Sequence, residues 1–463
     1  MSEKLTLEIL SEAVKNAAAF RYVTEYQPIG GPGDKVFPPT YLGGVYATET
    51  RLIDGHRVPC VLLDSVQSQA NRMELALLQA WRDKRINIPV ITVDFSGNEL
   101  QEVGRNFRIT SLDAPHRIAD AILRDSVAVV DGNSVPFGES EYARRWGNSR
   151  PHNATELFRL CPTALLFGIW GSPEKPGGLG TKFARAIVSE IMAIDVEFGV
   201  KTSSRIDPLG IPSNAATIYS NGAGAWTLNL NEAQRDGKGN PLVFGNGKNK
   251  GKPSAINHGN IPPTFTHYGD NAEGPDPMGA NGIQVEYAIR STSGDIMSHY
   301  LSRSAPPTAR KGQIAPGGIT MSKAIQTTVL SLSALRRLEF PILDDDAKPE
   351  QNLAARTALA ALGICAATLA RTDGDLRSRC QLHPFKTSQW EIVAGVGEVP
   401  LAYDLSSDDA VALLKSAAEA ASTAGIPWQT EEIKLKPSAN LIELVKRSQE
   451  VAGEGNTEDS SEA

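Results

Sequence analysis

Cysteine is scarce in this chain, with only four residues among 463. Cys60, Cys161, Cys365 and Cys380 are widely separated, and none of them forms a C-x-x-C pair. This spacing excludes a disulfide framework and the usual zinc-binding patterns. We expect the four thiols to be small buried side chains in a protein from a reducing compartment.

Long hydrophobic runs are missing as well. The longest apolar stretch, residues 358–370, covers 13 positions, whereas a helix needs about 20 apolar residues to cross a bilayer. The first twenty residues carry acids early and lack an apolar segment followed by a small-residue cleavage site, so we expect no signal peptide. These features predict a cytoplasmic protein without a membrane partner.

The chain has no excess of positive charge, since 46 lysines and arginines face 53 acids and the net charge is −7. That total disfavours a nucleic-acid partner, because binding phosphates needs a positive surface. However, residues 450–463 contain five acids and no base, which is typical of a solvated tail. Without them the net charge is −2, so the remainder can carry a local basic face.

Signatures of catalysis and metal binding are also lacking. The sequence contains no G-x-S-x-G elbow and no H-E-x-x-H helix. Three consecutive aspartates, residues 344–346, stand between prolines and are better interpreted as a solvated loop than as a magnesium site. The histidines occur singly, without ligand spacing, so we expect no metal, no cofactor and no enzymatic activity.

Periodicity predicts a mixture of helices and strands. An amphipathic helix is expected over residues 4–20. Val58–Leu63 reads as an apolar strand, Asp64 with Gln67 as a capping box that opens a helix to about Lys84, and Ile88–Phe95 as the next strand. The first half of the chain is therefore predicted to contain a β-α-β unit.

A second unit of the same kind is predicted to begin at Cys161. Residues 162–170, PTALLFGIW, read as a buried strand, residues 182–192 as a helix and residues 194–200 as a strand. The segment between the two units, about 96–159, is an insertion. Two such halves indicate an α+β fold with a split βαβ, ferredoxin-like core.

Residues 237–282 differ from the rest of the chain, because 23 of these 46 residues are glycine, proline or asparagine. This composition predicts a long irregular loop or hairpin, and such loops are usually functional or disordered. Further on, strands are expected at 284–291, 389–395 and 429–435, and helices at 321–338, 351–371, 407–423 and 438–449.

The first candidate binding motif is SVQSQANR, residues 65–72, at the start of the predicted helix. Gln67 and Asn71 share one helical stripe, and Ser68 and Arg72 share the next. Amides, a hydroxyl and a guanidinium beside a helix N-terminus favour a phosphate. A solvated polar helix start explains the same residues.

The second motif is PGGLGTKFAR, residues 176–185. Its glycines allow close approach of a ligand, and the predicted helix that follows provides N–H groups for an anion. The order Gly180-Thr181-Lys182 is not that of a Walker A loop, and the glycine spacing is not that of a dinucleotide site. Contact with a nucleic-acid backbone is the functional interpretation, and a flexible turn is the alternative.

The third motif is GNGKNKGKP, residues 245–253, inside the long loop. Lys248, Lys250 and Lys252 alternate, and no acid occurs between Gly237 and His267. The segment is either a solvated basic loop or one that becomes ordered on nucleic acid.

Two segments together resemble one particular family. LLDSVQSQANRME, residues 62–74, and LLFGIWGSPEKPGGLGTKFARAIVSEI, residues 165–191, are similar to the backbone subunit of type I-G CRISPR surveillance complexes, formerly called I-U, within the RAMP superfamily. The resemblance is strong over residues 36–200 and extends to about 435. It implies a modified RNA-recognition-motif palm over residues 36–435, with fingers near 96–159 and a thumb-like loop at 237–282. Residues 1–35 would form an N-terminal helix and turn, and residues 436–463 a terminal helix and acidic tail.

The resemblance also implies partners and site residues. Several copies would polymerise along one CRISPR RNA, with the target DNA strand paired to the guide and with a large subunit and a guide-processing or capping subunit as further Cascade partners. The RNA contacts carried over are Gln67, Ser68, Asn71, Arg72, Gly178, Gly180, Thr181, Lys182 and Arg185, to which we add Lys248, Lys250 and Lys252.

Two alternatives remain open. Some RAMP backbone subunits cut target RNA with a loop aspartate, for which Asp270 or Asp276 would serve here. An unrelated nucleotide- or phosphometabolite-binding protein could instead use the loop at residues 176–185.

Overall fold

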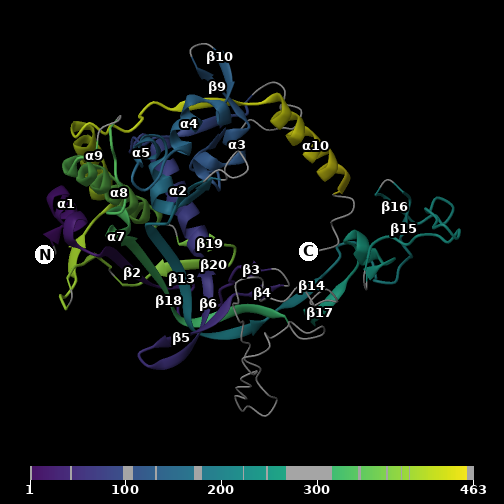
Figure 1. Ribbon diagram of the computed structural model, residues 1–463. Coiled ribbons are helices and arrows are strands. Elements are labelled where there is room, and N and C mark those ends of the chain that lie inside the picture. The colour runs from purple at the N-terminus through teal and green to yellow at the C-terminus, as the bar shows by residue number, and fades with distance from the viewer. Residues whose placement is uncertain are drawn as a thin grey trace. The chain divides into compact units, whose positions relative to one another are not determined.

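The computed structural model (Figure 1) describes residues 3–455 except 42–43, 97–107, 131–132, 172–179, 223, 247–248, 267–314, 343–345, 372–373, 387 and 396. The chain divides into two compact units. Unit 1 comprises residues 1–39, 46–197 and 320–442, and unit 2 comprises residues 40–45, 198–319 and 443–463.

Unit 1 is built on a large, mostly antiparallel sheet. Long strands form where apolar residues alternate with polar ones, as in β2, whose even positions are all buried. In spatial order the strands are β1 (Glu3–Lys4), β22 (Leu401–Asp404), β21 (Trp390–Val393), β2 (Ala19–Pro28), β18 (Pro316–Ser331), β13 (Ile187–Val200), β6 (His56–Asp64) and β5 (Thr48–Ile53), with β19 (Asp375–Arg377) and β20 (Cys380–Pro384) joined through β2.

Helices pack with this sheet into the core. The central one, α8 (Pro349–Ala370), contacts α9 (Ser407–Thr423), α2 (Val66–Arg82) and α1 (Leu7–Asn16). It is long and apolar enough to cross a membrane, but 72% of its most apolar window is buried inside the protein. All four cysteines are free and buried, as predicted.

A second sheet completes unit 1. Its strands, in order, are β10 (Asn133–Pro136), β9 (Ser126–Val130), β23 (Ile433–Pro437), β7 (Ile91–Asp94) and β8 (Arg108–Thr110). Four short helices lie near these strands in the chain. The first, α3 (Ala121–Arg124), precedes β9, and the others follow β10: α4 (Glu141–Gly147), α5 (Thr155–Leu160) and α6 (Pro162–Phe167). The described part of the predicted insertion therefore contributes strands as well as helices.

Unit 2 has short paired strands joined by turns. They are β14 (Thr202–Arg205) with β17 (Ile261–Phe265), and β15 (Tyr219–Ser220) with β16 (Trp226–Thr227), together with a 3-10 turn at Pro253–Ile256. The described part of the predicted long loop, residues 237–266, is mostly turns and short bridges. The strand predicted at 284–291 lies outside the described residues.

Several sequence predictions are confirmed. The α+β class is correct, and so are the helices predicted at 351–371, 407–423 and 438–449, the last of which is α10 (Ala439–Gly455). The strands predicted at 389–395 and 429–435 are also present, as β21 and β23.

The two β-α-β units do not form as predicted. β6 and β7 flank α2 in the chain, but they belong to different sheets. In the second unit, residues 162–167 are helix α6 instead of a strand, and residues 182–192 form β12 (Thr181–Phe183) and the first part of β13 instead of a helix. The predicted helix at 321–338 is mainly strand β18.

A physical reason accounts for the errors in β13 and β18. In both strands polar residues take buried positions, as Ser189 does in β13 and Gln326 does in β18, while Val188 is exposed. Burial therefore alternates along the strand without the matching alternation of apolar and polar residues in the sequence. The N-terminal helix prediction was also too long, because residues 19–28 form the central strand β2.

The packing of α8 around Gly363 gives a test of this core. A Cβ added at Gly363 would lie 3.5–3.6 Å from Leu166, Leu330 and Ile187, which is ordinary contact. We expect Gly363→Ala to raise the free energy of unfolding by about 0.5–1 kcal/mol, because alanine is the better helix former. Gly363→Leu should lower it by about 1–3 kcal/mol through overpacking. Urea denaturation followed by circular dichroism measures both, and equal effects of the two variants would contradict this packing.

Candidate nucleic-acid interface

The first motif forms the start of α2 and divides its polar residues between two faces. Ser65 is the N-cap, and its hydroxyl accepts a hydrogen bond from the Ser68 amide. The predicted capping box of Asp64 and Gln67 is therefore wrong by one residue. Gln67 and Asn71 are exposed on one stripe, whereas Ser68 and Arg72 turn toward the protein.

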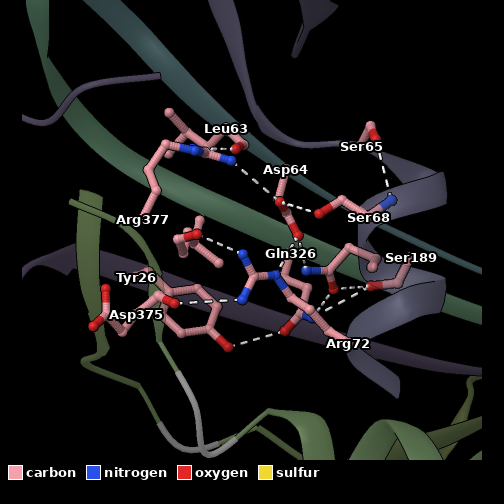
Figure 2. Close-up of polar contacts among 12 residues, drawn as sticks. Tyr26, Leu63, Asp64, Ser65, Ser68, Arg72, Ser189, Gln326, Asp375 and Arg377 are labelled. Atoms are coloured by element: carbon pink, nitrogen blue, oxygen red, sulfur yellow. Dashed lines mark hydrogen bonds and ion pairs between the residues drawn. The ribbon is translucent and has the colours of Figure 1, made fainter. Parts of the chain in front are cut away.

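The residue at the centre of the inward face is Asp64, the last residue of β6. Its side chain is fully buried, and a buried carboxylate is costly unless it is paired and hydrogen-bonded. Figure 2 shows the donors that converge on it. Ser68 Oγ donates at 2.8 Å, Gln69 Nε2 at 2.6 Å, Arg72 Nε at 2.9 Å and Arg377 at 3.4 Å.

A chain of buried hydrogen bonds continues from Gln69 across three strands. Gln326 on β18 donates to the Gln69 amide oxygen at 2.7 Å, and Ser189 on β13 donates to the same oxygen at 3.0 Å. Tyr26 on β2 donates to Gln326 at 2.9 Å, and burial raises the pKa of Tyr26 to about 12. The motif thus attaches α2 to the middle of the sheet (Figure 2).

Arg72 is occupied by protein contacts. Besides Asp64, its guanidinium donates to the backbone oxygens of Leu376 at 2.6 Å and Asp375 at 3.3 Å. The predicted contact of Arg72 with RNA stays a prediction, but its charge is already paired with a buried acid. Gln67 and Asn71 are the members of this motif with solvent-facing amides.

The second motif leads into a β-hairpin, since β11 (Ile169–Gly171) pairs with β12. Gly180 directly precedes β12, and Gly178 lies outside the described residues. The predicted helix after this loop is absent from residues 181–200, which are mainly strand. The argument that helix N–H groups bind an anion here therefore no longer holds.

The hairpin places an aromatic ring beside a cation. Trp170 on β11 lies directly opposite Lys182 on β12, so the two side chains project from the same face. The Trp170 side chain is 73% exposed, and Lys182 is also exposed. An indole so accessible to water has apolar surface available for a ligand. The sequence prediction named Lys182 but missed Trp170, and the only signal for it was its place at the end of an apolar run.

Thr181 of the second motif and Gly171 of β11 support the hairpin. Thr181 is buried and donates to the Gly147 carbonyl at the end of α4 at 2.7 Å. Gly171 lies against the Trp146 ring of the same helix, where a Cβ would come within 3.1 Å of the indole. Thr181 and Gly171 thus attach both strands of the hairpin to α4.

Arg185 supports the turn before β11. Its Nε donates to the Phe167 carbonyl at 3.1 Å. Burial and, secondarily, the neighbouring Arg117 lower the pKa of Arg185, although a guanidinium stays charged at neutral pH. Gly168 has φ 82°, and a Cβ there would come within 3.1 Å of Arg185 and of the Phe183 carbonyl, so only glycine fits this turn.

The third motif lies in unit 2. Lys250 and Lys252 are exposed, and Lys248 lies outside the described residues. Residues 198–266 contain seven bases, Lys201, Arg205, Arg235, Lys238, Lys248, Lys250 and Lys252, and three acids, Asp207, Glu232 and Asp236.

The three acids of this segment are used internally. Asp207 accepts from the amides of Gly259 and Leu209, and these bonds hold its pKa below the usual range. Asp236 accepts from two backbone amides in the same way, and Glu232 accepts from Thr227 and Asn229. These carboxylates bond to amides, a hydroxyl and a histidine, and none of them forms an ion pair with the described loop lysines, Lys250 and Lys252.

The residues of the ribonuclease alternative, Asp270 and Asp276, lie outside the described residues. Among the residues that the structure describes, no group of three or more histidines, cysteines and acids is placed to hold a metal ion.

A comparison with known protein families finds a match over the region that contains the first two motifs. Residues 20–198 match the family model of the CRISPR-associated protein GSU0053. The match covers less than half of the chain, and it supports a CRISPR-associated protein. The match includes α2, with its Asp64 network, and the Trp170–Lys182 hairpin. No curated protein matches the chain.

The GSU0053 match ends close to the boundary between the units. Its last residue, Phe198, is also the first residue of the main segment of unit 2. The loop lysines of unit 2 therefore lie outside the matched region and depend on their own chemistry for any assignment.

The division of α2 into two faces can be tested with adjacent residues. Arg72→Ala should lower the free energy of unfolding by about 2–4 kcal/mol, because it removes a charged partner from buried Asp64 and leaves two carbonyls without their donor. Asn71→Ala, on the exposed face, should change it by less than about 0.5 kcal/mol. Urea denaturation compares the two. Equal stability of both variants would show that Asp64 does not depend on Arg72.

Proposed function

We propose that this protein is a non-catalytic, CRISPR RNA-binding backbone subunit of a type I-G, formerly I-U, Cascade complex. The observation that carries the proposal is the exposed Trp170 ring beside Lys182, on a hairpin within the region of the GSU0053 match. Single-stranded RNA is recognised by this combination, because bases stack on aromatic rings while cations hold the phosphates.

The charges of the chain support an RNA partner. The net charge of −7 includes the five acids of residues 450–463. The three acids of residues 198–266 accept hydrogen bonds from neighbouring groups, while Lys250 and Lys252 face solvent. A guide-binding subunit needs basic groups along the RNA only, since binding through phosphates is local and weakens beyond the screening length.

In the proposed assembly, several copies polymerise along one guide RNA in the cytoplasm. The large subunit and a guide-processing or capping subunit complete the complex. Base pairing between the guide and the target DNA strand then reads sequence, and the protein holds the backbone of the guide. Stacking and phosphate contacts suit this role because neither depends strongly on base identity.

The hairpin variants test this assignment. Trp170→Ala should weaken guide RNA binding by about 1–3 kcal/mol, the usual value of one stacked base, whereas Trp170→Phe should retain most of the affinity. Fluorescence anisotropy with two guides of unrelated sequence measures the effect, which should be similar for both. Equal binding by the alanine variant and the wild type would remove the basis of the proposal.

The salt dependence of binding tests the cation separately. Lys182→Ala should reduce the slope of log affinity against log salt concentration by about 0.7, the value for one contact with a single strand. Lys15→Ala, at the exposed end of α1, is the matched control and should leave the slope unchanged. If the purified wild-type protein retained no RNA and assembled equally well without it, the function itself would be wrong.

A further inference from the structure

Unit 1 contains a groove with an apolar lining and a basic rim, formed by residues distant in sequence from the hairpin. It lies between the end of α2 and α9, has a volume of about 970 Å³, and its lining includes Trp81, Ile86, Leu414 and Trp428. We call it the α2–α9 groove. Its volume is at the upper end of the range of pockets that bind a ligand or peptide segment.

The rim of the α2–α9 groove is basic. Arg82, Lys84, Arg85 and Lys415 line it, against the single acid Glu419. Arg85 pairs with Asp408 at 3.0 Å. Within the described part of the chain, Arg82, Lys84 and Lys415 form no ion pair. The groove therefore combines an apolar lining with cations that are available to acids.

Trp428 adds a specific requirement. It is 8% exposed, and its ring packs against Phe158 with centroids 5.6 Å apart. Its indole N–H is buried and has no hydrogen-bond acceptor among the described residues. A buried donor without an acceptor is destabilising, so an acceptor supplied by a bound segment would stabilise this site.

We propose that the α2–α9 groove binds the carboxyl-terminal segment, residues 444–463, of a second copy of this chain. This inference rests on the proposed function, which requires copies to lie side by side. The groove would then be a contact that links one copy to the next, in addition to the RNA that they share.

The first half of that segment needs an apolar partner. The helix α10 has no fully buried residue over 439–448, and Leu444 is 64% exposed. Helices in water gain most of their stability from packing an apolar face, and a single helix of this length is marginal alone. A groove lined by tryptophan, isoleucine and leucine side chains can bury such a face.

The second half of the segment carries the charge opposite to that of the groove's rim. Residues 450–463 contain Glu450, Glu454, Glu458, Asp459 and Glu462 and no base. Their carboxylates complement the cations of the groove, and their oxygens or backbone carbonyls can accept from the Trp428 indole. The segment also carries Lys446 and Arg447, so its five acids leave it a net charge of −3, which is opposite to the charge of the rim. RNA is a poorer match, because Trp428 is 8% exposed with its ring against Phe158 and so offers little free face on which a base could stack.

The direction in which the chain leaves the groove indicates that the bound segment comes from a second copy and not from the same copy. Next to the groove, at Asn87 and Thr430, the chain enters β7 and β23, which are parallel neighbours and run in one direction. β23 covers about 16 Å, and α10 has a length of about 25 Å. Because β23 leads the chain away from the groove, the chain would have to reverse its direction for residues 444–463 to reach the groove of the same copy.

Carbodiimide cross-linking of mixed-isotope assemblies tests the proposal, because this reagent joins a carboxylate to an amine in direct contact. Full-length protein in ordinary and 15N-labelled forms is mixed at high salt, reassembled with guide RNA and cross-linked. We expect links between Lys84 of one isotope and the acids of residues 454–462 of the other. RNA content, measured by the ratio of absorbance at two wavelengths, reports separately on the proposed function.

Charge reversal provides the control, with Lys84 kept as the reporter. Arg82→Glu with Lys415→Glu should reduce the mixed-isotope links at least about tenfold. Glu458→Lys with Asp459→Lys should restore them in that background, and Lys15→Glu should have no effect. Links within one isotope only, undiminished links in the reversed variant, or ultraviolet cross-links from the groove to RNA would each overturn the proposal.

Discussion

The buried carboxylate of Asp64 is the constraint on which the rest of unit 1 depends. A charge with no access to water is tolerated only when donors surround it, and here they come from α2 and β19. Arg72 extends the arrangement to the backbone of residues 375–376, and Gln69 extends it across β13 and β18. One acid thereby fixes the position of a helix relative to strands whose contacting residues lie 120 to 304 positions away in the chain.

This constraint gives the SVQSQANR motif two separate functions. The inward residues hold the fold, and the outward amides of Gln67 and Asn71 remain available to a ligand. The hairpin of β11 and β12 is divided in the same way, with Thr181 bonded to α4 and Trp170 and Lys182 facing solvent. If a substitution in either motif weakens the proposed RNA binding, the free energy of unfolding of that variant must also be measured. Only then can the residue be assigned to the interface.

The position of the charges matters more than their sum. The three acids of residues 198–266 accept backbone or side-chain hydrogen bonds, and five others lie at residues 450–463. Exposed cations are present at the hairpin, in the loop of unit 2 and along the α2–α9 groove. An acidic protein can in this way present basic surfaces to RNA and to an acidic segment of its neighbour.

The sequence by itself determined the α+β class and the helices α8, α9 and α10, because their apolar spacing and boundaries are local signals. It also placed Gln67, Asn71 and Lys182 among the candidates. Only the tertiary structure decided that residues 182–192 and 321–331 are mainly strand, since pairing with neighbouring strands from distant parts of the chain overrides local preference. Likewise, the burial of Asp64, the pairing of Arg72 and the exposure of Trp170 follow from contacts between distant segments, which no local pattern encodes.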